Sequence, residues 1–263
     1  MKPGLFVLIL ILSVTALVLA VLKFNSIQLL HPSTSSTLTP TPVSEKNIFG
    51  NEIAFTARDK SAISATLYSP LDISPPFKSL ILVHEFDSDR SDWSSIIPIL
   101  LENGYRVFAY DLRGMGKSVS QTPKDSPEKY FNTLVTDLSD AVEYLRNLPD
   151  TDREHIGIIG SSIGANIVYI HSGLDQNTTS ASVAISPVNT TSFLSGKNLT
   201  KFRPSNIFFI TDQKDSVASQ DFFGKSSNPK SIKIYPNTQS HGVELLKDQQ
   251  TIDDILNWLS TNI

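Results

Sequence analysis

The chain has 263 residues, of which 40% are hydrophobic and 18% charged, and its formal net charge is −4. This length and composition can supply the core of one sizeable α/β domain, and there is no basic block of the kind that nucleic-acid binding requires. The chain contains no cysteine, which excludes disulfides, thiolate metal sites and a cysteine nucleophile.

The N-terminus contains an uncharged apolar run from Leu5 to Leu22, in which Ser13 and Thr15 are the only polar residues. A helix of this length spans about 27 Å, close to the hydrocarbon thickness of a bilayer. We therefore expect residues 1–24 to form a retained transmembrane signal anchor. A cleaved signal peptide is the alternative, although Val18-Leu19-Ala20 is a poor cleavage site. Under either interpretation, the rest of the chain is expected to be exported from the cytoplasm.

The next segment, residues 25–47, is rich in Ser, Thr and Pro from His31 onward and has no apolar periodicity. Such a segment cannot bury a core, so it indicates a linker, either a stalk or a disordered leader. Apolar patterning begins at about Ile48 and continues to Ile263. We therefore assign residues 48–263 to a single folded domain.

Within this domain, short apolar runs alternate with segments of helical periodicity. The first two runs, residues 51–59 and 61–69, alternate apolar and polar residues and predict a hairpin. Further strands are expected at residues 79–85, 105–111, 155–160, 182–187, 206–211 and 231–236, and helices at residues 92–103, 130–148, 163–172 and 243–262. The order predicts a mostly parallel sheet with an antiparallel N-terminal hairpin and helices on both faces. Ligands bind such sheets beyond the carboxyl ends of the strands.

The segment GSSIG, residues 160–164, lies between a predicted strand and a predicted helix and fits Gly-x-Ser-x-Gly around Ser162. A one-residue turn there would lift the Ser162 hydroxyl to the sheet edge, at a helix N-terminus that favours developing negative charge. Ser161 fits the variable position, and its side chain should point elsewhere. The alternative is a serine that caps the helix after a glycine turn.

A serine hydroxyl needs a base, and the chain offers five histidines. His31 lies in the linker, His155 at the amino end of a strand, and His171 more than two turns into the helix after Ser162. His84 ends a strand that precedes the serine. His241 follows the last predicted strand at the carboxyl edge, so we predict His241 as the base.

The base needs a carboxylate, and Asp212 and Asp215 both follow the strand that ends at Thr211. We favour Asp215, because Asp212 comes directly after the strand and could form an Asx turn. Backbone N–H donors for an oxyanion are expected from Ile163 and from Phe86 in the loop after Val83. A carboxylate at Glu85 would repel an oxyanion unless it is turned away or paired, and we favour an outward-facing loop carboxylate over a catalytic role.

These stretches resemble the α/β-hydrolase superfamily, and the resemblance covers essentially Ile48 to Ile263. The matching segments are LVHEF at 82–86, DLRGMGKS at 111–118, GSSIG at 160–164, TDQKDSV at 211–217 and SHG at 240–242. The resemblance implies a triad of Ser162, Asp215 and His241, with Phe86 and Ile163 as oxyanion donors. It implies no metal or organic cofactor.

Three features depart from the family pattern, and one of them is Asp212, which stands where glycine is common. Glu85 replaces the usual glycine of the oxyanion loop, and the short excursion from Pro187 to Ser205 leaves room for a minimal cap or none. An open cleft is therefore expected.

The resulting hypothesis is a membrane-tethered or exported serine hydrolase that cleaves a carboxylic ester or related acyl bond through an acyl-enzyme. The expected partners are a small-molecule, acyl or peptide substrate and a membrane, reached through the N-terminal helix, but not nucleic acid. The alternatives are a peptidase of the same fold and a non-catalytic binding protein with an inactive hydrolase fold.

Overall fold

The computed structural model describes the chain within the unit Ile48–Ile263, namely residues 50–119, 126–175, 177–189, 201–236 and 238–263. The predicted anchor at residues 1–24 and the predicted linker at residues 25–47 lie outside the described residues. Of the helices that are described, none combines the length and apolarity that a membrane span needs.

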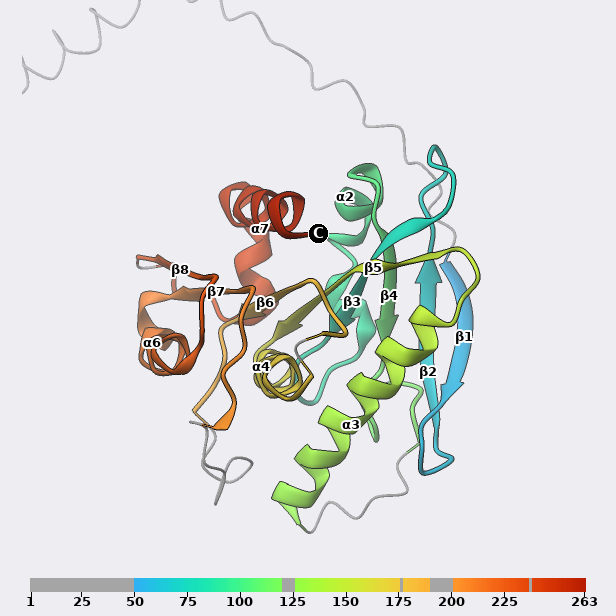
Figure 1. The fold of residues 1–263 in the computed structure, drawn as a ribbon. Coiled ribbons are helices and arrows are strands. Elements are labelled where there is room, and N and C mark those ends of the chain that lie inside the picture. Colours follow the sequence, from blue (N-terminus) through green and yellow to red (C-terminus); the bar gives the residue numbers. More distant parts are fainter. Residues whose placement is uncertain (1–49, 120–125, 176, 190–200, 237) are drawn as a thin grey trace, which may run out of the picture. The chain divides into compact units, whose positions relative to one another are not determined.

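The domain is built on one eight-stranded sheet with the order β1-β2-β4-β3-β5-β6-β7-β8 (Figure 1). Its strands are β1 (Gly50–Thr56), β2 (Ala62–Tyr68), β3 (Phe77–Val83), β4 (Arg106–Tyr110), β5 (Thr151–Ser161), β6 (Ala181–Ile185), β7 (Ile207–Asp212) and β8 (Lys230–Tyr235). β2 runs antiparallel to both β1 and β4, and every other pairing is parallel. The predicted mostly parallel sheet with an antiparallel N-terminal hairpin is confirmed.

Helices pack on both faces of the sheet, as predicted (Figure 1). The helices are η1 (Arg90–Trp93), α2 (Ile97–Glu102), α3 (Pro127–Arg146), α4 (Ile163–Leu174), η3 (Gln213–Asp215), α6 (Ser216–Lys225), η4 (Gly242–Lys247) and α7 (Gln249–Asn262). Side chains alternate along each strand, so Ile81 and Val83 of β3 join the core under α3, α4 and α6. Leu80 and Leu82 join the core under α2 and α7.

The structure differs from the predicted helices in three places. The predicted helix 92–103 is divided into η1 and α2, because Pro98 lacks the N–H that a continuous helix needs and fits only the first turn of α2. The predicted helix 243–262 is divided at Asp248, whose carboxylate accepts from the N–H of Gln250 and starts α7. Helix α6 was not predicted from the sequence. The predicted absence of a cap depends on residues 190–200, which lie outside the described residues.

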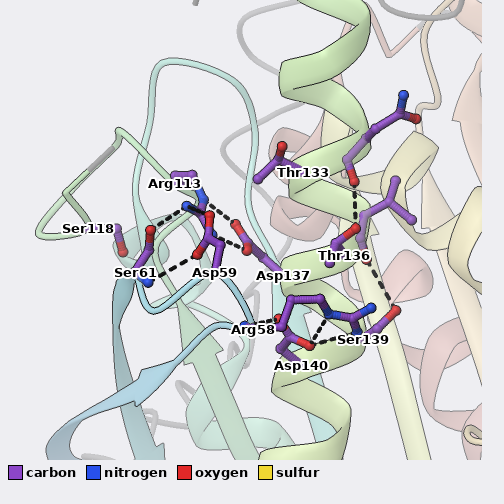
Figure 2. A network of polar contacts seen from close by, with 12 residues as sticks. Arg58, Asp59, Ser61, Arg113, Ser118, Thr133, Thr136, Asp137, Ser139 and Asp140 are labelled. Atoms are coloured by element: carbon purple, nitrogen blue, oxygen red, sulfur yellow. Dashed lines mark hydrogen bonds and ion pairs between the residues drawn. The ribbon is translucent and has the colours of Figure 1, made fainter. Parts of the chain in front are cut away.

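An ion-pair network centred on the buried Arg113 joins the β1–β2 turn, the loop after β4 and helix α3 (Figure 2). The Arg113 side chain is 1% exposed and donates to Asp137 through Nε at 2.9 Å and Nη2 at 2.5 Å. It also donates to Asp59 at 2.6 Å and to the Ser61 hydroxyl at 2.5 Å. The hydrogen bond from Arg113 lowers the pKa of Asp59 to about 2. Arg113 therefore links three segments that are distant in the sequence.

We expect Arg113→Met to lower the free energy of unfolding by about 3–5 kcal/mol, because the buried Asp137 carboxylate would lose its cation. Urea denaturation measures this change. The matched control is Lys117→Met in the same loop, whose partner Glu52 is exposed, and it should leave the stability essentially unchanged. Equal effects of the two substitutions would contradict this account.

Candidate active site

The turn at Ser162 joins the end of β5 to the start of α4 through a single residue. Ser162 has φ 53° and ψ −117°, a strained conformation for a residue with a side chain. A Cβ at Gly160 would overlap the carbonyl of Gly164, and a Cβ at Gly164 would overlap the carbonyl of Val83. Both glycines are therefore needed for the close approach of β5, α4 and β3.

The Ser162 side chain does not cap helix α4 in the described structure, which removes the alternative of a capping serine. Its Oγ lies 2.9 Å from Nε2 of His241 instead. On the other side of the ring, Nδ1 of His241 lies 2.7 Å from Oδ2 of Asp215. An ionised carboxylate only accepts, so Nδ1 carries the proton and Nε2 is free to accept from the serine hydroxyl. The structure thus brings the three predicted triad residues into one hydrogen-bonded chain.

Among the described histidines, only His241 is hydrogen-bonded to Ser162. His155 pairs with Asp152, at the amino end of β5. His171 is buried in α4, and its burial lowers its pKa to about 4, so its ring is neutral near pH 7. His84 is fully buried, its Nε2 accepts from the N–H of Leu112, and burial lowers its pKa. His31 lies outside the described residues.

Asp212 and Asp215 occupy distinct environments. The Asp212 carboxylate is fully buried and accepts from the N–H of Lys214 at 2.8 Å, which forms the Asx turn weighed above. Its other oxygen accepts from the N–H and hydroxyl of Thr238 and from the N–H of Gln239. The hydrogen bond from the Thr238 side chain and those from the backbone lower the pKa of Asp212. Asp212 therefore holds the loop before His241, whereas Asp215 contacts the imidazole itself.

The two predicted oxyanion donors lie on the same sheet edge as Ser162. Ile163 is the first residue of α4, where a backbone N–H has no partner within the helix. Phe86 lies in the loop after β3, and β3 pairs with β5 in a register that sets Val83 beside Gly160. Nδ1 of His84 donates to the carbonyl of Glu85 at 2.7 Å while its Nε2 accepts from Leu112, which ties this loop to the loop after β4. Their role as oxyanion donors stays a prediction.

The favoured expectation, that Glu85 faces outward, is wrong, and the carboxylate is paired instead. Its Oε1 accepts from the Ser161 hydroxyl at 2.6 Å and from the backbone N–H of Val243 at 2.8 Å. These two donors satisfy the carboxylate on the protein side. Sequence analysis missed this contact, and the unusual carboxylate in the oxyanion loop was the signal that could have drawn attention to it.

The chain is similar to hydrolases in both sequence and structure. A family model described as serine aminopeptidase, S33, matches residues 74–202. A provisionally named non-heme chloroperoxidase of Synechocystis sp. is 28% identical over 116 residues, 44% of this chain and 37% of that protein. A provisionally named esterase/lipase of Mycoplasma pneumoniae is 23% identical over 154 residues, 59% of this chain and 52% of that protein. The matches thus span about half the length of these relatives or less.

A solved esterase structure from Pyrococcus furiosus superposes with a TM-score of 0.67 at 19% identity, covering 82% of this chain and 91% of that one. A likeness at this level of identity concerns the fold. It agrees with the eight-stranded sheet and the two helical layers described above.

The two aspartates should respond differently to truncation. We expect Asp212→Ala to lower the free energy of unfolding by about 2–4 kcal/mol, because several donors lose a buried acceptor. Asp215→Ala should cost about 1 kcal/mol or less, because it removes one hydrogen bond from a partly exposed ring. Urea denaturation of the two variants checks this. A larger loss for Asp215→Ala would contradict the assigned environments.

Proposed function

We propose that this chain, which has the α/β-hydrolase fold and is similar to that superfamily in sequence, is a serine hydrolase that cleaves a carboxylic ester or related acyl bond through an acyl-enzyme. The observation that carries the proposal is the hydrogen-bonded chain from Ser162 through His241 to Asp215, built on a strained turn. A serine on a strained turn at the carboxyl end of a central strand, with a base within hydrogen-bond distance, is the arrangement of an activated nucleophile.

In this mechanism the Ser162 Oγ attacks the substrate carbonyl carbon while Nε2 of His241 takes its proton. Asp215 holds the Nδ1 proton and stabilises the imidazolium that forms. The backbone N–H groups of Ile163 and Phe86 donate to the developing oxyanion, and each such donor is worth about 10²–10³ in rate. The imidazolium then protonates the leaving alkoxide. Loss of the alcohol leaves the acyl-enzyme. Water, deprotonated by His241, then attacks the acyl carbon, and the imidazolium returns that proton to the Ser162 Oγ as the carbon–Oγ bond breaks and the acid leaves.

A peptidase is the second candidate, because the family model that matches residues 74–202 is described as a serine aminopeptidase. The same triad serves both reactions, since specificity depends on the substrate pocket rather than on the nucleophile. Rates measured with nitrophenyl acyl esters and with aminoacyl nitroanilides separate the two candidates. We favour the ester, in line with the similarity to a provisionally named esterase/lipase over 154 residues.

We expect a fluorophosphonate probe to label the wild-type protein and to leave Ser162→Ala unlabelled, since the probe reacts with an activated serine. Nitrophenyl acetate hydrolysis should fall by about 10⁴-fold or more in the same variant. Ser161→Ala is the matched control and should still be labelled, because Ser161 contacts Glu85 rather than the base. A folded wild-type protein that takes no label would support the non-catalytic binding protein instead.

We further propose that residues 5–22 anchor the protein in a membrane, with residues 48–263 outside the cytoplasm. The support is the uncharged apolar run and the linker that follows it. Full-length protein should stay with membranes in alkaline carbonate, and protease added to intact cells should degrade the domain. Deletion of residues 1–24 should abolish both results. A shorter, secreted chain would support the cleaved signal peptide, and a protected domain would contradict export.

A further inference from the structure

Glu85 joins three segments that carry the candidate chemistry. Its Oε1 accepts from the hydroxyl of Ser161, one residue before Ser162, and from the N–H of Val243, two residues after His241. Glu85 itself lies one residue before Phe86 in the predicted oxyanion loop. A single carboxylate oxygen therefore connects the nucleophile turn (residues 160–164), the histidine loop (residues 238–243) and the oxyanion loop (residues 84–87).

The Glu85 carboxylate occupies the space that a side chain at position 242 would need, so this packing requires Gly242. Gly242 has φ +55°, and a Cβ there would overlap Oε1 of Glu85 and lie 2.5 Å from Oγ of Ser161. The Ser161 side chain is fully buried, so its hydroxyl depends on a protein acceptor. Glu85, Ser161 and Gly242 thus form one closely packed group behind His241.

The histidine loop is held by a carboxylate on each side. Before His241, Asp212 accepts from Thr238 and Gln239, as described above. After His241, Glu85 accepts from Val243. Thr238 and Gln239 are exposed, so hydrogen bonds rather than burial determine where this loop lies. On the side that leads into η4, the loop is held by the hydrogen bond from Val243 to Glu85.

We propose that Glu85 is a positioning residue for the hydrolase reaction: it holds the His241 loop and the oxyanion loop in register with the nucleophile turn. This inference rests on the proposed function. Glu85 acts through Val243 and Ser161 and does not itself exchange a proton with the substrate. A negative charge beside an oxyanion would be unfavourable, but the Glu85 carboxylate accepts from the Ser161 hydroxyl and the Val243 N–H on the protein side.

The proposal predicts a loss of turnover when the acceptor is removed. Glu85→Met keeps the length of the side chain but no acceptor, and it should lower kcat for nitrophenyl acetate by about a hundredfold, the effect of a misplacement of about 1 Å. KM should change little, because the substrate does not contact the carboxylate. Glu85→Gln keeps an amide oxygen that can accept both hydrogen bonds, so its kcat should stay within about threefold of wild type.

Asp87→Asn is the matched control. Asp87 is an exposed carboxylate in the same loop, and its removal should leave kcat and KM unchanged. A Glu85→Met variant with wild-type kcat would overturn the proposal. So would a Glu85→Gln variant as impaired as Glu85→Met, because position 85 would then act through charge and not through its two hydrogen bonds.

Hydrogen exchange separates a failure of this inference from a failure of the proposed function. The amide of Val243 and its neighbours in η4 should exchange faster in Glu85→Met than in wild type and Glu85→Gln. If the wild-type protein hydrolyses no ester and takes no fluorophosphonate, the proposed function fails, and the exchange result alone decides whether Glu85 holds the loop. Unchanged exchange in Glu85→Met would overturn the proposal in either case.

Discussion

The backbone conformation of Ser162 is the constraint on which the rest of the site depends. A non-glycine residue at φ 53° costs of the order of 1–3 kcal/mol and persists only where its surroundings hold it. Here β5 is paired on both sides, with Gly160 opposite Val83 of β3 and Ala184 of β6. The first turn of α4 lies against the carbonyls of Val83 and His84. The strain is therefore carried by the most central part of the sheet.

Three carboxylates near this turn have different tasks because their hydrogen-bond partners differ. Among the described residues, Asp212 accepts from Lys214, Thr238 and Gln239, so it shapes a loop. Asp215 accepts from the imidazole of His241, so it orients the base. Glu85 accepts from one hydroxyl and one amide on two segments, so it connects them. The three residues are all carboxylates, so their tasks are distinguished by their hydrogen-bond partners and not by residue type.

The sheet and the relative placement of the triad could be predicted from the sequence because both depend on local patterns and on topology. The apolar runs at Leu80–Val83 and Ile156–Ile159 predict buried strands, and parallel strands place their carboxyl ends at one edge. The breaks before Pro98 and at Asp248 are local too, but the apolar periodicity ran through them. The contacts of Arg113 with Asp59 and of Glu85 with Val243 join residues 54 and 158 positions apart. No local pattern encodes such contacts.

Because position 85 is a glutamate and not the usual glycine, the conformations of Ser161, Gly242 and Val243 depend on its side chain. With glycine at position 85, the Ser161 hydroxyl and the Val243 amide would both lose their acceptor. With Glu85 in this position, glycine is favoured at position 242, because φ is +55° and a Cβ there would overlap the carboxylate unless Glu85 moved. Loss of the Glu85 carboxylate therefore leaves the Ser161 hydroxyl and the Val243 N–H without their acceptor, and a side chain at position 242 introduces a steric overlap, whereas Ser161→Ala only removes one of the two donors to Glu85. Glu85 and Gly242 therefore constrain each other, and the hydrogen bond from Val243 to Glu85 fixes the segment that follows His241.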